Sequence, residues 1–141
     1  MSEPKGLRVL VCGGRDYSDR DFMDRYLRMF DRRKGPIKLI ISGEARGADT
    51  LAKQWAIGCG CPYLGFPANW KVFGRDAGPT RNQQMLDEGK PDWVIAFKGG
   101  RGTADMVARA EKAGLPVWKV GERDFSKVHE FLNRVAEEVA P

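Results

Sequence analysis

Short apolar runs alternate along the chain with longer stretches in which apolar residues recur at helical spacing. The runs have the length of β-strands, and several are nearly continuous in apolar residues, which is typical of strands covered on both faces. We therefore predict strands at residues 7–12, 37–42, 62–66, 93–97 and 116–120. The helical spacing predicts helices that include residues 22–30, 48–56, 83–86 and 103–113, and a last helix at 125–139.

A glycine followed closely by a proline separates each predicted helix from the next strand, at residues 35–36, 60–62, 89–91 and 114–116. Glycine just past a helix end adopts the left-handed conformation without steric cost, and proline prevents the helix from continuing. Successive prolines are 26, 29 and 25 residues apart. This spacing predicts right-handed crossovers in one Rossmann-like α/β domain of about five mostly parallel strands. The domain spans residues 1–141, with its core at 7–120.

Charge and composition narrow the function classes. The chain has 24 Lys and Arg against 19 Asp and Glu, and this surplus is spread evenly rather than gathered in a basic block, which disfavours nucleic-acid binding. No apolar run approaches the roughly 18 residues of a membrane span, and the N-terminus is polar, so we expect a cytoplasmic protein that binds no membrane. The three cysteines and one histidine lack zinc-site spacing, so no metal is expected.

Glycine and arginine recur together in the loops that follow the predicted strands. In open parallel sheets such loops lie at one edge, where ligands bind. Glycine lets the backbone approach a ligand, helix N-termini add partial positive charge, and arginine offers a fork for phosphate. We therefore predict an anionic, phosphate-bearing ligand, and the candidate contacts are Gly13, Gly14, Arg15, Ser42, Gly43, Glu44, Arg46, Gly47, Asp49, Trp70, Arg81, Asn82, Gly99, Gly100, Arg101, Gly102 and Thr103.

The segment after the third strand, residues 67–78, is longer than an ordinary strand-to-helix loop. Its Trp70 could stack on a base or could equally anchor the loop. Asp49 could cap or brace its helix instead of touching a ligand. The Walker A motif is absent, and residues 100–105 lack the last glycine of the dinucleotide fingerprint. We therefore disfavour P-loop NTPases and ordinary NAD dehydrogenases, and we expect no resident cofactor.

Four separated motifs resemble the YspA-like family of the SLOG superfamily, which joins the Smf/DprA proteins with the LOG enzymes. They are Gly-Gly-Arg-Asp at 13–16, Ser-Gly-x-Ala-Arg-Gly-Ala-Asp at 42–49, Gly-Pro-x-Arg-Asn-x-x-Met at 78–85 and Gly-Gly-x-Gly-Thr-Ala-Asp-Met at 99–106. The resemblance covers roughly residues 7–120. It implies a Rossmannoid fold and a nucleotide or nucleotide-derived ligand, and it suggests a sensor in stress or phage-conflict signalling.

The resemblance leaves catalysis open. LOG phosphoribohydrolases carry a glutamate three residues after the threonine of their Gly-Gly-x-Gly-Thr motif, and Met106 occupies that position here. Cleavage of an N-glycosidic bond needs a carboxylate, for which Asp105 and Glu44 are the candidates. The alternative function is therefore a LOG-like nucleotide hydrolase, and DprA-like DNA binding is a weaker third. Related families often dimerise, so a homodimer is also open.

Overall fold

The computed structural model describes residues 5–121, and the predicted helix at 125–139 lies outside them. Five strands form one sheet in the order β3-β2-β1-β4-β5, and every neighbouring pair is parallel. The strands are β1 (Leu7–Cys12), β2 (Ile37–Ser42), β3 (Tyr63–Gly65), β4 (Trp93–Ala96) and β5 (Val117–Lys119). The predicted Rossmann-like α/β fold is confirmed, and only the ends of the three later strands are shorter than expected.

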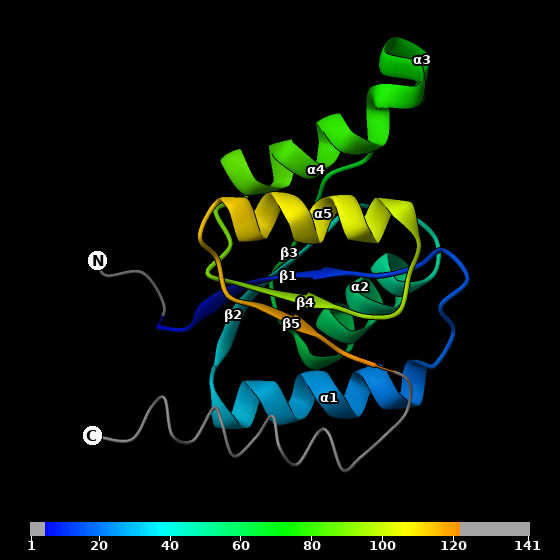
Figure 1. The fold of residues 1–141 in the computed structure, drawn as a ribbon. Coiled ribbons are helices and arrows are strands. Elements are labelled where there is room, and N and C mark those ends of the chain that lie inside the picture. Colours follow the sequence, from blue (N-terminus) through cyan, green and yellow to red (C-terminus); the bar gives the residue numbers. More distant parts are fainter. Residues whose placement is uncertain (1–4, 122–141) are drawn as a thin grey trace.

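Helices cover both faces of this sheet (Figure 1). Helices α1 (Arg20–Arg33) and α2 (Ala48–Cys59) lie on one face, while α4 (Ala77–Asp87) and α5 (Arg101–Lys112) lie on the other. Alternate residues of β1 pack into the hydrophobic layers on the two faces of the sheet, because side chains along a strand point to opposite faces. Val9 and Val11 pack toward α1 and α2, and Leu10 and Cys12 pack toward α4 and α5.

The glycines at the predicted helix ends work in two different ways. Gly60 and Gly114 adopt left-handed conformations, with φ of 75° and 81°, as predicted. Gly35 and Gly89 do not, which corrects the prediction for those two positions. A Cβ at Gly35 would lie 2.6 Å from the Asp31 carbonyl oxygen, and one at Gly89 would overlap the Met85 carbonyl oxygen. Close approach to the preceding helix, rather than dihedral freedom, requires glycine there.

The segment after β3 is more ordered than a long loop. It forms the short helix α3 (Trp70–Phe73) and a 3₁₀ turn, η1 (Gly74–Asp76), and α4 begins at Ala77. The side chain of Asn69 accepts a hydrogen bond from the Val72 N–H at 3.1 Å, which caps α3. In Figure 1, α3 projects from the end of α4, away from the sheet.

The strand order changes direction between β1 and β4. The chain moves outward from β1 through β2 to β3, then returns to the other side of β1 for β4 and β5. The ends of β1 and β4 are level, since Cys12 pairs with Ala96. The loops that follow these two strands therefore diverge from one point, which is where open α/β sheets hold their ligands. No helix among residues 5–121 is long and apolar enough to cross a membrane.

Candidate functional site

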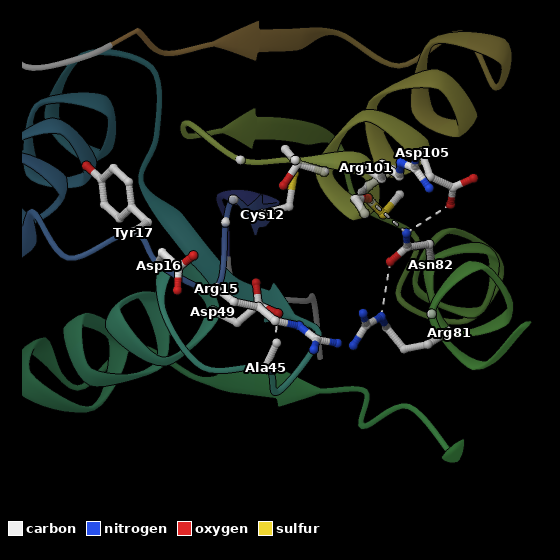
Figure 2. Close-up of a pocket in the computed structure, with 18 of the residues that line it drawn as sticks. Cys12, Arg15, Asp16, Tyr17, Ala45, Asp49, Arg81, Asn82, Arg101 and Asp105 are labelled. Atoms are coloured by element: carbon white, nitrogen blue, oxygen red, sulfur yellow. Dashed lines mark hydrogen bonds between the residues drawn. The ribbon is translucent and has the colours of Figure 1, made fainter. Parts of the chain in front are cut away.

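A pocket of about 1040 Å³ opens at the carboxyl edge of the sheet, above the point where the strand order reverses (Figure 2). That volume is at the upper end of the range usual for small-molecule sites. Most of the predicted contacts line this pocket, and so does the candidate catalytic Asp105. These residues are Gly13, Gly14, Arg15, Asp49, Trp70, Arg81, Asn82, Gly99, Gly100, Arg101, Gly102, Thr103 and Asp105.

The loops after β1 and β4 pack directly on each other at the base of the pocket. The Gly14 N–H donates to the Lys98 carbonyl oxygen at 2.8 Å. A Cβ at Gly99 would lie 2.6 Å from the Gly14 nitrogen and would overlap Thr103 Oγ1. Gly14 and Gly99 are therefore required by the contact between two backbones, and this contact fixes where the first turn of α5 begins.

The N-terminus of α5 is exposed to the pocket without a side-chain cap. Its N-cap residue is Gly100, which has no side chain to accept a hydrogen bond from the first turn. A Cβ at Gly100 or Gly102 would meet no atom within 4 Å. Since the first N–H groups of a helix carry partial positive charge, this open turn offers hydrogen-bond donors to an anion.

Two arginines enter the pocket from opposite walls. Arg15 follows β1 and Arg81 comes from α4, and Figure 2 shows their side chains directed toward one another. Arg81 is held in place, because Nε donates to Asn82 Oδ1 at 3.0 Å and Nη1 donates to the Gly43 carbonyl oxygen. The Arg15 guanidinium lies 5.4 Å from the centre of the Trp70 ring. Burial lowers the pKa of Arg81; the charge of Asp49 opposes this, and that of Arg15 adds to it.

A polar network supports Arg81 from the side of α5. The Asn82 amide donates to Asp105 Oδ2 at 2.9 Å and to the Gly102 carbonyl oxygen at 3.2 Å. Arg109 Nε donates to the same Asp105 oxygen at 2.8 Å. Burial alone would raise the pKa of Asp105, but the hydrogen bonds from Arg109 and Asn82 and the charge of Arg109 lower it. Asp105 is therefore an ionised carboxylate at neutral pH.

Asp49 is a second carboxylate, and its pKa is shifted in the opposite direction to that of Asp105. It is buried in the first turn of α2 and accepts a hydrogen bond from the Ala45 N–H at 3.2 Å. Burial raises the pKa of Asp49 to about 6, although backbone hydrogen bonds and the charge of Arg81 act against the rise. Beside it, burial and the charge of Asp49 raise the pKa of the Cys12 thiol, so that this thiol stays protonated.

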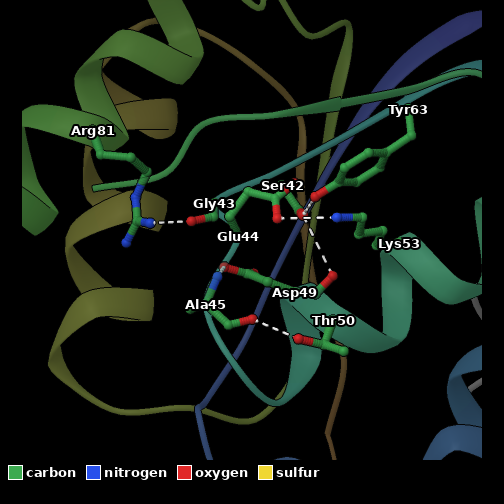
Figure 3. Close-up of polar contacts among 9 residues, drawn as sticks. All are labelled: Ser42, Gly43, Glu44, Ala45, Asp49, Thr50, Lys53, Tyr63 and Arg81. Carbon is green, nitrogen blue, oxygen red and sulfur yellow. Dashed lines mark hydrogen bonds and ion pairs between the residues drawn. The ribbon is translucent and has the colours of Figure 1, made fainter. Parts of the chain in front are cut away.

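Five predicted contacts lie outside the pocket, at the end of β2 and on the turn that follows it. Figure 3 shows three of them, Ser42, Gly43 and Glu44. Ser42 is fully buried, and its Oγ lies 2.6 Å from the Tyr63 hydroxyl oxygen. Glu44 is directed toward β3 and forms an ion pair with Lys53 at 3.3 Å, away from its predicted catalytic position. Arg46 is three-quarters exposed and pairs with Asp16 at 3.4 Å.

The remaining two serve the backbone. Gly43 supplies the carbonyl that accepts from Arg81, and a Cβ on it would meet that guanidinium. Gly47 has a φ of 79° and lies so close to the β1 loop that a Cβ would overlap the Gly14 carbonyl oxygen. The turn after β2 therefore positions Asp49 and Arg81, and of its residues 43–47 only Ala45 lines the pocket.

Sequence reasoning missed about half of the lining. Some missed residues belong to a recognised motif, as Met85 and Met106 do at the ends of the motifs at 78–85 and 99–106. Their place in those motifs could have identified them as lining residues. Gly78 and Pro79 likewise belong to the motif at 78–85. Arg75 comes from the long segment at 67–78, and nothing in the sequence indicated which of its side chains turn inward. The missed lining residues are Cys12, Asp16, Tyr17, Ser18, Asp19, Ala45, Arg75, Gly78, Pro79, Met85, Lys98 and Met106.

Solved structures share this fold at low sequence identity. DNA processing protein A (DprA) from Streptococcus pneumoniae superposes with a TM-score of 0.63 at 19% identity, and covers 94% of this chain, while the chain spans 56% of DprA. The molybdenum cofactor binding protein from Rippkaea orientalis gives a TM-score of 0.60 at 21% identity, over 98% of this chain and 89% of that protein. The Moco carrier protein from Chlamydomonas reinhardtii gives 0.55 at 14% identity, over 92% and 84%.

Sequence comparison identifies the family. Residues 7–73 match the family described as "YspA, cpYpsA-related SLOG family". The Gene 61 protein of Mycobacterium phage D29 is 35% identical over 125 residues, which cover 82% of this chain and 98% of the phage protein. Together with the glycine- and arginine-bearing loops around one pocket, these matches show that the chain belongs to the YspA-related SLOG family.

Proposed function

We propose that the pocket binds a phosphorylated nucleotide or a nucleotide-derived ligand, and that the protein acts as a sensor of it. The observation that carries this proposal is the meeting of Arg15 and Arg81 from opposite walls, beside the uncapped N-terminus of α5. Two guanidinium groups facing each other repel, as the influence of Arg15 on the Arg81 pKa reflects. A phosphate between them would offset that repulsion and accept hydrogen bonds from both.

The outer part of the pocket suits the base of a nucleotide. Trp70 is half exposed, and it lines the pocket while Arg15 lies over its ring. A heteroaromatic base stacks on tryptophan with little dependence on its identity. Neighbours of this fold are described as binding the molybdenum cofactor, which supports a small-molecule ligand for this pocket. A role in stress or phage-conflict signalling is consistent with a phage relative.

A panel of ligands tests the proposal by thermal shift. It contains AMP, cyclic AMP, ADP-ribose, NAD and GTP, and a ligand at a hundred times its dissociation constant should add about 2.7 kcal/mol to the free energy of unfolding. That amount moves the melting temperature by several degrees. The shift should be lost in Arg15→Gln and Arg81→Gln and retained in Arg25→Gln, an exposed arginine on α1 that pairs with Asp21. No shift with any of these ligands would contradict the proposal.

A second function, cleavage of the nucleotide, is favoured by one observation. Asp105 lines the pocket and is kept ionised by Arg109 and Asn82, as a carboxylate that stabilises a ribosyl cation must be. The Glu44 side chain is paired with Lys53 and does not line the pocket, so it does not suit this role. If the protein is a nucleotide hydrolase, nucleoside monophosphates should release free base, and Asp105→Asn should abolish the release. Release that survives Asp105→Asn would exclude Asp105 as the catalytic carboxylate.

A further inference from the structure

Asp49 is a buried acid in a pocket that otherwise favours anions. Asp49 lines the pocket wall, and the residue is 7% exposed. Hydrogen bonds from the backbone N–H groups of Ala45 and Gly43 hold the carboxylate in one position. It therefore cannot turn away when a ligand enters, and whatever charge it carries acts on the ligand through a site of low dielectric.

The groups around Asp49 define the net charge of the inner pocket. Cys12 faces it from β1, Glu44 from the turn after β2, Tyr63 from β3 and Arg81 from α4. Cys12 and Tyr63 are neutral at pH 7 to 8, because burial raises both pKa values. The Glu44 carboxylate is paired with Lys53.

Asp105 also lines the pocket, but its carboxylate is paired with Arg109. Of the groups that act on Asp49 and Arg81, the charges that remain are those of Asp49, Arg81 and Arg15, the last of which acts on Arg81 across the pocket. With Asp49 ionised, one negative charge stands against two positive ones. Because burial raises the pKa of Asp49 to about 6, the carboxylate is ionised at pH 8 and largely protonated near pH 5. The net charge of the inner pocket is then one positive unit at pH 8 and two near pH 5.

We propose that Asp49 determines which class of phosphate this pocket accepts, favouring a singly charged phosphodiester over a doubly charged terminal monophosphate at neutral and alkaline pH. The inference rests on the proposed function, and it specifies the ligand further. A terminal phosphate has a second pKa of about 6, so it carries two negative charges at pH 8. A diester or cyclic phosphate carries one. Repulsion by an ionised carboxylate is proportional to ligand charge, so it costs the dianion twice as much free energy as the monoanion.

Asp49→Asn removes the charge and keeps the shape and the acceptor oxygen. At pH 8 this variant should bind both AMP and cyclic AMP more tightly than the wild type does. The gain should be about tenfold for AMP and about threefold for cyclic AMP, since the logarithm of the gain doubles with the ligand charge. Each ligand serves as its own reference, so contacts to base and ribose cancel. The dissociation constants are measured by calorimetry at about 0.15 M salt, which screens distant charges.

Asp21→Asn is the matched control, because Asp21 is an exposed carboxylate on α1 that does not line the pocket. It should change the two affinities little and equally. An equal gain for both ligands in Asp49→Asn, or no gain, would overturn the inference while leaving the proposed function intact. Failure of the wild type to bind any nucleotide would instead contradict the proposed function.

A measurement on the wild type covers the case in which Asp49→Asn does not fold. Sulfate carries two charges and cyclic AMP one across the whole range from pH 5 to pH 8. As the pH rises through about 6, the affinity for sulfate should fall by about the square of the factor for cyclic AMP. Equal factors for the two anions, or flat profiles, would refute the role of Asp49.

Discussion

The glycines around the pocket are of two kinds, which differ in whether a Cβ atom would have room. Gly99 lies against the Gly14 nitrogen and Thr103, where a methyl group has no room. Gly102 stands in the first turn of α5 with nothing within 4 Å of a Cβ, and it lines the pocket. The first is needed by the protein itself, while the second leaves space that only a ligand would use.

Substitution by alanine separates these purposes. Gly99→Ala should lower the free energy of unfolding by about 1–3 kcal/mol, because the added methyl forces two loops apart. Gly102→Ala should raise it by up to about 1 kcal/mol, since alanine is the better helix former. The same Gly102→Ala variant should bind nucleotide more weakly. Urea unfolding and calorimetry check the pair, and a Gly102→Ala variant that binds at full strength would show that the ligand does not approach this turn.

Asp49 also makes stability depend on pH. Its pKa is about 6 in the folded protein against an ordinary value of 3.8, so the folded state binds the proton more tightly than the unfolded chain does. Its contribution is therefore fully present below pH 3.8 and is lost as the pH rises through about 6, a loss of about 3 kcal/mol.

The difference in unfolding free energy between Asp49→Asn and the wild type should accordingly grow in favour of the variant from pH 5 to pH 8. Urea titrations of both proteins at each pH provide the measurement. The comparison matters because Asp105, whose pKa is lowered, has the opposite trend, with stability lost as the pH falls. A difference that stays constant with pH would mean that Asp49 has an ordinary pKa when folded.

Among the α-helices of residues 5–121, α3 alone has no buried residue. Trp70 is 50% exposed and contacts the pocket, whereas Phe73 is 47% exposed and does not line it. The two aromatic side chains thus differ in position while having nearly the same exposure. This helix can contribute to ligand binding without contributing much to the stability of the fold.

Trp70→Ala should therefore leave the melting temperature nearly unchanged and weaken nucleotide binding, by about 1–3 kcal/mol if a base stacks on the ring. Binding of inorganic sulfate, which has no base, should be affected little. Phe73→Ala on the same helix is the control and should alter neither. Equal effects of Trp70→Ala on nucleotide and sulfate would assign Trp70 to the positioning of Arg15 instead of to stacking.

The elements that the sequence predicted well are those in which many residues repeat one pattern. The strands at 7–12 and 37–42 and the buried stripe of α1 are examples, because burial on both faces or on one stripe leaves a clear periodicity. A four-residue helix such as α3 has too few residues for a period. The turn after β2 shows another limit: Glu44 and Arg46 lie in the right loop, but loop position does not determine side-chain direction.

At the scale of the whole molecule, the pocket joins parts of the chain that are far apart in sequence. Arg15 precedes β2 and Arg81 follows β3, while α5 belongs to the last third of the described residues. The sequence alone indicated that these loops share an edge, because parallel strands place their carboxyl ends together. It did not indicate that α4 sends Arg81 back across that edge to the carbonyl of Gly43.

Sulfate should therefore stabilise the entire fold, beyond its general effect on proteins. The unfolding free energy of the wild type should rise more in sodium sulfate than that of Arg81→Gln at the same concentration. The general exclusion of sulfate from protein surfaces is common to both proteins and cancels in the comparison. Chemical denaturation at several sulfate concentrations gives the two slopes, and identical slopes would indicate that no anion is held at Arg81.

The place where the strand order reverses has a mechanical meaning as well. One wall of the pocket belongs to the first half of the chain and the opposite wall to the second, and they meet through the contact of Gly14 with Lys98 and of Arg81 with Gly43. A ligand bound between these walls would contact both halves of the chain at once. Its binding would reduce the motion of one wall relative to the other without any change in secondary structure.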